Sequence, residues 1–185
     1  DLDLLVMGYD GAANVTTVYE NDPPGSFTPV SGLSLVGLRA GAADWADWDG
    51  DGDVDLMMVG HNGTSRQVIF YKNDGAGQLN DDGTHGLPGL SLCDAAWGDY
   101  DNDGDLDLAL TGEISGSPSP QRCARIYQNT GNGTLTMVVD LSQIYRSSCA
   151  WGDHDNDGDL DIAFCGYTGS DIHTTIYTNT GAGFA

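Results

Sequence analysis

Three segments of the chain share a pattern in which a tryptophan precedes aspartates at every second position and then an unbroken apolar run. The segments are "WADWDGDGDVDLMMVG" from Trp45, "WGDYDNDGDLDLALTG" from Trp97 and "WGDHDNDGDLDIAFCG" from Trp151. Short apolar runs without alternation are typical of strands buried on both faces. The alternating aspartates do not suit a strand, because like charges on one face repel. Each segment therefore predicts two strands joined by an acidic loop.

The pattern recurs at a nearly constant interval. Trp45, Trp97 and Trp151 stand 52 and 54 residues apart, and the opening "DLDLLVMG" matches the second half of the motif, with Gly8 placed 52 residues before Gly60. A second block follows each copy: "VYENDPPGSF", "FYKNDGAGQL", "IYQNTGNGTL" and "IYTNTGAGFA". These blocks predict an aromatic strand and a Gly/Asn hairpin turn. A long fixed period indicates a repeat architecture.

Each repeat predicts four short antiparallel strands and no helix. Units of about 50 residues with four strands are typical of β-propeller blades, and an open β-solenoid-like array is the alternative. We expect an all-β fold, with one propeller segment over residues 1–185. The expected blades are 1–34, which lacks a first strand, 35–86, 87–141 and 142–185, which lacks most of its last strand. Neighbouring subunits or the rest of a longer chain are expected to complete the ring.

The charge of the chain is strongly acidic. There are 28 acidic and 6 basic residues, which give a net charge of −22. Nucleic acid is excluded as a partner, because binding it requires a basic surface. No run of about 18 apolar residues is present, so no membrane span is expected. The 39% hydrophobic content argues against disorder.

The acidic loops require a cation, and calcium is the natural candidate. Ca²⁺ takes 6 to 8 oxygen ligands in flexible geometry, and glycine at loop position 6 permits the positive φ of a curling loop. An EF-hand also begins D-x-D-x-D-G, but it needs a glutamate at position 12 and flanking helices. Position 12 here is Met58, Leu110 or Phe164. Three calcium sites are therefore expected, structural rather than catalytic because the loop recurs in every repeat.

These loops, at constant spacing within four-strand repeats, resemble the FG-GAP or VCBS-type repeat of integrin α-subunit propellers and many secreted bacterial proteins. The resemblance covers essentially the whole chain. It implies that loop positions 1, 3, 5 and 9 bind calcium through side chains and that position 7 binds through its main chain. Position 7 is acidic here, unlike in many family members. Asp1 and Asp3 match positions 7 and 9 of a loop whose first half is absent, and are not expected to bind alone. The expected metal residues are Asp47, Asp49, Asp51, Asp53, Asp55, Asp99, Asp101, Asp103, Asp105, Asp107, Asp153, Asp155, Asp157, Asp159 and Asp161.

The aromatic residues beside the loops have two alternative roles. The tryptophans before each loop are expected to form core between blades, with ligand stacking as the alternative. The residues at loop position 2 are also candidates for exposed recognition: Trp48, Tyr100 and His154.

Cysteines and sequons give weaker signals. The four cysteines lack CxxC spacing, so a zinc site is not expected. If the third loop is symmetric about Asp157, Cys149 faces Cys165 and forms a disulfide, and Cys93 pairs with Cys123 by default; small buried thiols are the alternative. The glycosylation candidates are Asn14, Asn62 and Asn132.

The leading functional hypothesis is a calcium-stabilised binding or scaffold module, secreted or at the cell surface, that contacts protein or glycan ligands in adhesion or surface assembly. Extracellular modules bind calcium at roughly 10⁻⁴ to 10⁻³ M, which suits such a site. The Ser/Pro-rich loop from Glu113 to Arg122 is a recognition candidate. A structural subunit of a filament or surface layer is the alternative. A secreted polysaccharide lyase is a third hypothesis, but no nucleophile motif such as G-x-S-x-G is present, so we expect no enzyme.

Overall fold

A computed structural model describes residues 2–114, 121–131 and 133–185, and every regular element within these ranges is a β-strand. The strands are β1 (Leu4–Tyr9), β2 (Asn14–Asn21), β3 (Phe27–Pro29), β4 (Arg39–Ala46), β5 (Asp55–His61), β6 (Arg66–Asn73), β7 (Leu79–Gly83), β8 (Leu90–Gly98), β9 (Asp107–Ile114), β10 (Gln121–Asn129), β11 (Leu135–Asp140), β12 (Tyr145–Gly152), β13 (Asp161–Tyr167) and β14 (Ile172–Tyr177). The expected all-β class is confirmed.

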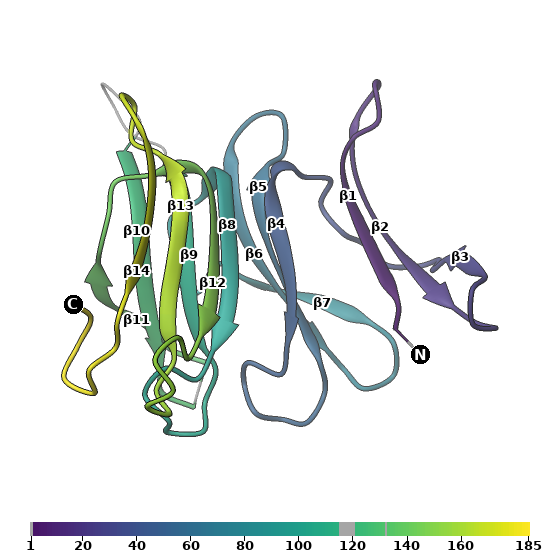
Figure 1. The fold of residues 1–185 in the computed structure, drawn as a ribbon. Coiled ribbons are helices and arrows are strands. Elements are labelled where there is room, and N and C mark those ends of the chain that lie inside the picture. The colour runs from purple at the N-terminus through teal and green to yellow at the C-terminus, as the bar shows by residue number, and fades with distance from the viewer. Residues whose placement is uncertain (1, 115–120, 132) are drawn as a thin grey trace.

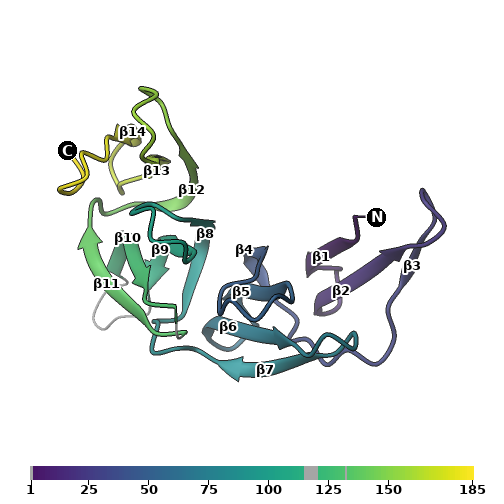
Figure 2. The same cartoon turned by 90° about the horizontal axis from the view of Figure 1, so that it is seen from below.

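The strands form four antiparallel units in which each strand pairs with the next along the chain. Units β4–β7 and β8–β11 have four strands each, and a bridge between Gln67 and Leu90 joins them. Units β1–β3 and β12–β14 have three strands each. The units stand side by side (Figure 1) and form an arc with β1, β4, β8 and β12 along its concave side (Figure 2). The described strands do not close into a barrel, and the arrangement is that of propeller blades in a partial ring.

The core lies between the units, because the second strands of the two inner units, β5 and β9, are buried on both faces. Leu56 and Met58 of β5 pack with Leu5 and Met7 of the first unit. Met57, the residue between them, faces the third unit in the next cluster. A third cluster, around Ile162 and Phe164, fills the space between β8–β11 and β12–β14. The apolar runs without alternation therefore arise because successive side chains serve two different interfaces.

The tryptophans before the loops follow this arrangement, with one exception. Trp151 stacks on Tyr100 of the preceding unit and donates Nε1–H to the Ala96 carbonyl at 3.1 Å. Trp97 packs against the core cluster between the second and third units. Trp45 is 38% exposed, because the first unit offers no first strand for it to cover. The core expectation is therefore wrong for Trp45.

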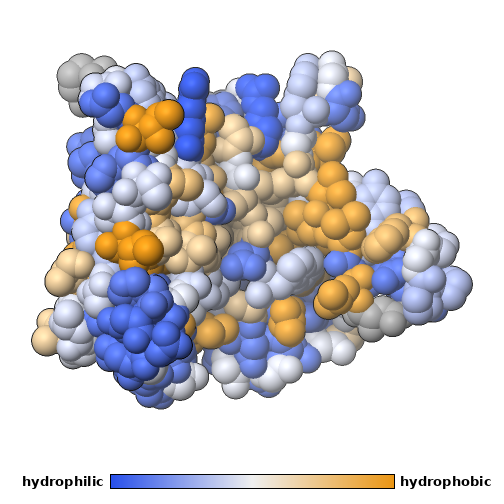
Figure 3. All heavy atoms as spheres, viewed as in Figure 1, coloured by the Kyte–Doolittle hydropathy of each residue, from blue (hydrophilic) through white to orange (hydrophobic). Residues whose placement is uncertain are grey.

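Both end units present apolar side chains to solvent. Leu4 and Val6 are exposed on β1, and Ile172 and Ile176 are exposed on β14. In Figure 3 hydrophobic atoms accordingly gather over β1 and β2 on the right, and at two spots over β14 on the left. These faces correspond to faces that are buried between the inner units.

Both expected disulfides are wrong, since all four cysteines are free. Cys149 lies opposite Phe164, and Cys165 lies opposite Ser148. Neighbouring residues of a strand point to opposite faces, so Cys149 is buried between units while Cys165 is exposed. Cys93 and Cys123 are buried in the cluster between the second and third units. Burial raises the pKa of each of these two thiols to about 12, which keeps them protonated and unreactive.

Candidate metal centres

The three acidic loops lie at the same end of their units. They connect β4 to β5, β8 to β9 and β12 to β13, at the lower end in Figure 1. Each loop curls at positions 4 and 6, where φ is positive: in the second loop, φ is 58° at Asn102 and 98° at Gly104. Asparagine tolerates this region better than most residues, and glycine has no Cβ to clash there.

Backbone amides orient the carboxylates inside each loop. In the second loop, Asp99 Oδ1 accepts the Asp103 N–H and Asp99 Oδ2 accepts the Gly104 N–H, both at 3.1 Å. Asp153 accepts the corresponding two bonds in the third loop at 3.1 Å. The position 1 side chain therefore points into the curl of its own loop.

The position 9 aspartates begin each second strand and are fully buried. Asp107 is 0% exposed; its Oδ1 accepts the Asn129 N–H at 2.8 Å and its Oδ2 accepts the Tyr100 N–H at 3.1 Å. Asp161 accepts the equivalent bond from Asn179 at 2.7 Å. Position 9 thus ties the loop to the hairpin between the third and fourth strands.

Positions 1, 3 and 9 converge in the first two loops. One ligand atom from each of these aspartates lies within 4.8 Å of the others, in the sets Asp47, Asp49, Asp55 and Asp99, Asp101, Asp107. In the third loop the same limit is met by Asp153, Asp155 and Asp157, and separately by His154, Asp155 and Asp161. Position 5 therefore joins a cluster only in the third loop. His154 is a candidate metal ligand there, whereas the sequence had suggested only a recognition role for it.

The position 7 side chains point away from these clusters. A Cβ placed at Gly75 or Gly131 would collide with the carboxylate of Asp53 or Asp105, so these carboxylates lie over the hairpin glycines. Asp159 Oδ1 accepts the Asn102 amide of the preceding loop at 2.9 Å. The acidic position 7 thus faces the hairpin or the neighbouring loop.

Burial disfavours the charged form of two position 9 carboxyls. It raises the pKa of Asp107 to about 7 and that of Asp55 to about 6, against the opposing effect of their backbone hydrogen bonds, and neighbouring aspartates raise both further. The pKa of Asp161 is instead lowered, chiefly by the His154 N–H. A cation beside Asp55 and Asp107 would offset the cost of ionising them.

The residues of the first two loops fit a calcium ion. In the first loop, Asp47 Oδ1 and Asp55 Oδ2 are buried and have no hydrogen-bond partner within the described part of the chain. Buried polar atoms are nearly always paired, so these two oxygens call for a ligand. All the donors are carboxylate oxygens, which are the ligands of hard cations such as Ca²⁺. The third loop departs from this set, because His154 Nδ1 lies 2.6 Å from Asp161 Oδ2.

An asparagine in each of the last two hairpins connects neighbouring units, and sequence reasoning had not singled it out. Asn129 Nδ2 donates to the Leu106 carbonyl at 3.1 Å and to the Trp48 carbonyl of the preceding unit at 2.7 Å. Asn179 Nδ2 reaches the Tyr100 carbonyl in the same way at 2.8 Å. The asparagine that recurs two residues after a tyrosine in each repeat was the available signal.

This contact changes the expectation for loop position 2. Trp48 is only 3% exposed and packs on Phe70 and His85, with ring centroids 5.2 and 4.6 Å apart. Tyr100 is half-buried against Trp151. The expectation of exposed recognition residues is therefore wrong for Trp48, while His154 is exposed.

The glycosylation candidates and the Ser/Pro-rich recognition loop differ in their surroundings. Asn14 donates its amide to the His61 carbonyl at 3.3 Å and its Oδ1 is buried, whereas Asn62 Oδ1 caps a turn. Asn132 lies outside the described residues, as do 115–120 of the Ser/Pro-rich loop. At the ends of that loop, Glu113 pairs with Arg66 and Arg122 donates to the Thr168 carbonyl.

An open hollow of about 600 Å³ lies between the first two units, at the end opposite the acidic loops. Tyr9, Asn14, Arg39 and Asn62 are among the residues that line it. The Arg39 guanidinium carbon lies 5.6 Å from the centre of the Tyr9 ring.

No helix within the described ranges is long and apolar enough to cross a membrane.

Comparison with protein families identifies the repeat. The model of the FG-GAP-like repeat matches residues 1–58 and residues 47–110, which together span more than half of the chain. No curated protein matches the sequence. The chain belongs to the FG-GAP-like repeat family.

Proposed function

We propose that the chain is a calcium-stabilised binding or scaffold module that works outside the cell. The observation that carries this proposal is the convergence of three carboxylates in each of the first two loops, where the position 9 aspartate is fully buried. In the first loop, two of the buried oxygens also lack partners among the described residues. An acidic turn exposed to solvent would not bury its position 9 carboxylate. Bound calcium would supply the positive counter-charge for these carboxylates.

The chain's own residues give the ion a structural role. In the second loop, Asp99, Asp101 and Asp107 would hold it, and Asp107 would link it to Asn129 of the hairpin. Asn129 in turn reaches the preceding unit. Occupancy of the loop would therefore stabilise both its own unit and the contact between units.

The acidic charge and the expected affinity support an extracellular location. Extracellular calcium modules bind at roughly 10⁻⁴ to 10⁻³ M, so such sites are filled outside the cell and empty in the cytosol. Three divalent ions would reduce the net charge of −22 to −16, since each contributes +2. FG-GAP-like repeats are typical of extracellular proteins.

The hollow opposite the acidic loops is the candidate ligand site. Tyr9 is 56% exposed there and offers an aromatic face, while Arg39 and Asn62 offer charged and polar groups. An aromatic ring combined with hydrogen-bonding side chains suits a glycan or a polar protein loop. The ligand would thus bind at one end of the units and calcium at the other.

Tyr9→Ala and Arg39→Ala are expected to abolish ligand capture on a glycan array or an extracellular-protein array in 2 mM calcium. Phe27→Ala is the matched control, because Phe27 is similarly exposed but does not line the hollow. A ligand whose capture is unchanged by Tyr9→Ala and Arg39→Ala would place recognition elsewhere. Polysaccharide turnover on the same substrates would instead support the lyase hypothesis.

A structural subunit is the second candidate, favoured by the apolar end faces. Leu4 and Val6 on β1 correspond, 52 residues earlier, to Leu56 and Met58, which pack between units. The exposed Ile176 of β14 marks the open face of the last unit. Each end face therefore suits a further unit, from a longer chain or a neighbouring copy.

Self-assembly predicts concentration-dependent species larger than the 19.4 kDa chain in sedimentation velocity. Val6→Asp and Ile176→Asp are each expected to return the chain to a monomer, because a charge would be buried in the contact. Val54→Asp, at an exposed loop residue, is the control. A monomer at all concentrations would reject assembly from this chain alone.

A further inference from the structure

We propose that Lys72 is a resident counter-cation of the first acidic loop, which competes with calcium there and makes this site weaker than that of the second loop. The inference rests on the proposed calcium binding. It concerns a difference among the loops that the repeat pattern does not reveal.

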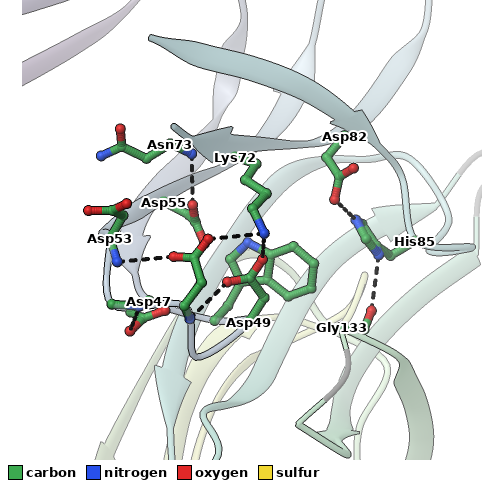
Figure 4. Close-up of polar contacts among 12 residues, drawn as sticks. Asp47, Asp49, Asp53, Asp55, Lys72, Asn73, Asp82, His85 and Gly133 are labelled. Atoms are coloured by element: carbon green, nitrogen blue, oxygen red, sulfur yellow. Dashed lines mark hydrogen bonds and ion pairs between the residues drawn. The ribbon is translucent and has the colours of Figure 1, made fainter. Parts of the chain in front are cut away.

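Lys72 lies on β6 and extends into the loop between β4 and β5 (Figure 4). Its Nζ contacts Asp49 Oδ2 and lies 3.1 Å from Asp51 Oδ2. A lysine ammonium group is charged at neutral pH. Lys72 is the only lysine of the chain. A fixed positive charge therefore sits on two aspartates of this loop.

The other loops have no such charge at the equivalent position. The residue before the hairpin asparagine is Lys72 in the first complete repeat, Gln128 in the second and Thr178 in the third. Gln128 Nε2 donates to Asp101 Oδ2 at 2.6 Å, so a neutral amide occupies the place of the ammonium group. The repeat thus provides its own comparison between a charged and a neutral neighbour.

The first loop also differs in its internal hydrogen bonds. Its Asp51 N–H donates to Asp49 Oδ1 at 3.2 Å, whereas the corresponding amides of the other loops donate to position 1. Asp47 Oδ1 is consequently left without a partner among the described residues, as is Asp55 Oδ2. Asp55 is 0% exposed, so this oxygen cannot be satisfied by bulk water. The loop therefore retains two buried acceptors that the lysine does not reach.

Asp49 belongs to both arrangements. It is the lysine's partner and also a member of the cluster with Asp47 and Asp55. An incoming divalent ion must share Asp49 with the ammonium group or displace it. Even at the dielectric of bulk water, a unit charge about 4 Å from a divalent ion lowers the affinity of that ion by roughly tenfold to a hundredfold. Without calcium the same charge stabilises the loop.

Site-resolved calcium titration by NMR of the whole chain tests this inference. The position 6 amides of Gly52, Gly104 and Gly158 each donate to position 1 of their own loop, so each reports one site. In the wild type, the Gly52 midpoint is expected at roughly tenfold higher calcium than the Gly104 midpoint. Lys72→Gln, which copies the second loop, is expected to remove most of this difference.

Two further variants serve as matched controls. Lys72→Arg retains the charge and is expected to keep the weak midpoint at Gly52. Gln128→Lys introduces the charge in the second loop and is expected to raise the Gly104 midpoint by roughly tenfold. In EDTA, Lys72→Gln is expected to melt below the wild type, because Asp49 and Asp51 lose their counter-charge; in saturating calcium the order reverses.

The outcomes separate this inference from the proposed function. If all three glycines respond at the same calcium concentration and Lys72→Gln changes neither the midpoints nor the melting order, the role of Lys72 is rejected while calcium binding stands. If no glycine responds up to 20 mM calcium, both the proposed function and the inference fail. A Lys72→Gln variant that does not fold is replaced in the test by Gln128→Lys.

Discussion

Asn129→Ala is expected to destabilise the chain by about 3 to 5 kcal/mol, because it leaves one buried and one partly buried carbonyl without this donor, at roughly 1–3 kcal/mol each, and also removes packing. The side chain is 0% exposed and donates to the carbonyls of Leu106 and Trp48. Its Oδ1 also accepts the Gly131 N–H at 3.2 Å. The measurement is urea-induced unfolding followed by tryptophan fluorescence.

Asn73→Ala is the matched control for this variant. Asn73 makes the same bonds within its own unit, donating to the Val54 carbonyl at 2.9 Å and accepting the Gly75 N–H at 3.1 Å. It is only half-buried, so its loss is expected to cost about 1 kcal/mol. Equal losses for the two variants would show that the bond between units contributes nothing.

The repeat pattern was sufficient to predict the strands and the acidic loops. The apolar runs after Asp55, Asp107 and Asp161 form β5, β9 and β13. Apolar runs without alternation are typical of strands buried on both faces, so these strands could be predicted. The curling of the loops followed from the glycine at position 6, which takes positive φ in all three. These features are local, and local chemistry determines them.

Contacts between units could not be predicted in this way. Trp45 was expected in the core and Trp48 at the surface, but Trp48 is buried and Trp45 is exposed. Trp48 is buried because the hairpin of the next unit covers it. Trp45 is exposed because the first unit has no first strand against which it could pack. Both depend on packing geometry that one repeat does not contain. The position of Lys72 over the first loop likewise depends on how β6 lies beside it.

The prediction of a disulfide between Cys149 and Cys165 was wrong because it assumed the wrong register between β12 and β13. The third loop was taken as symmetric about Asp157, which would set Cys149 opposite Cys165. Gly152 pairs with Asp161, so the turn is centred between residues 156 and 157. A shift of one residue moves a side chain to the other face of the sheet. Cys165 therefore faces away from Cys149.

Removal of calcium is expected to lower the melting temperature by about 8 to 16 °C. At calcium tenfold above its dissociation constant, one site stabilises the folded state by about 1.4 kcal/mol, so three sites give about 4 kcal/mol. In a chain of this size, 1 kcal/mol shifts the midpoint by about 2–4 °C. The physical reason is the crowding of five aspartates in each loop. Burial already raises the pKa of the position 9 aspartates of the first two loops, Asp55 and Asp107.

Variants in a single loop test how much each site contributes to the calcium-induced rise in melting temperature. Asp99→Asn removes a side chain of the second cluster and is expected to reduce the calcium-induced rise by about a third, because one of three sites is weakened. Asp10→Asn, outside the acidic loops, is expected to leave the rise unchanged. Magnesium at the same concentration is expected to stabilise the chain less than calcium, because it requires a stricter octahedral geometry.

The most direct test of the account is differential scanning calorimetry of the chain in 10 mM calcium and in EDTA, combined with native mass spectrometry of the calcium-loaded form. Calcium binding in the three loops predicts a rise of about 8 to 16 °C in calcium and a mass increase of three calcium ions. Identical melting curves, with no ion retained at millimolar calcium, would contradict it.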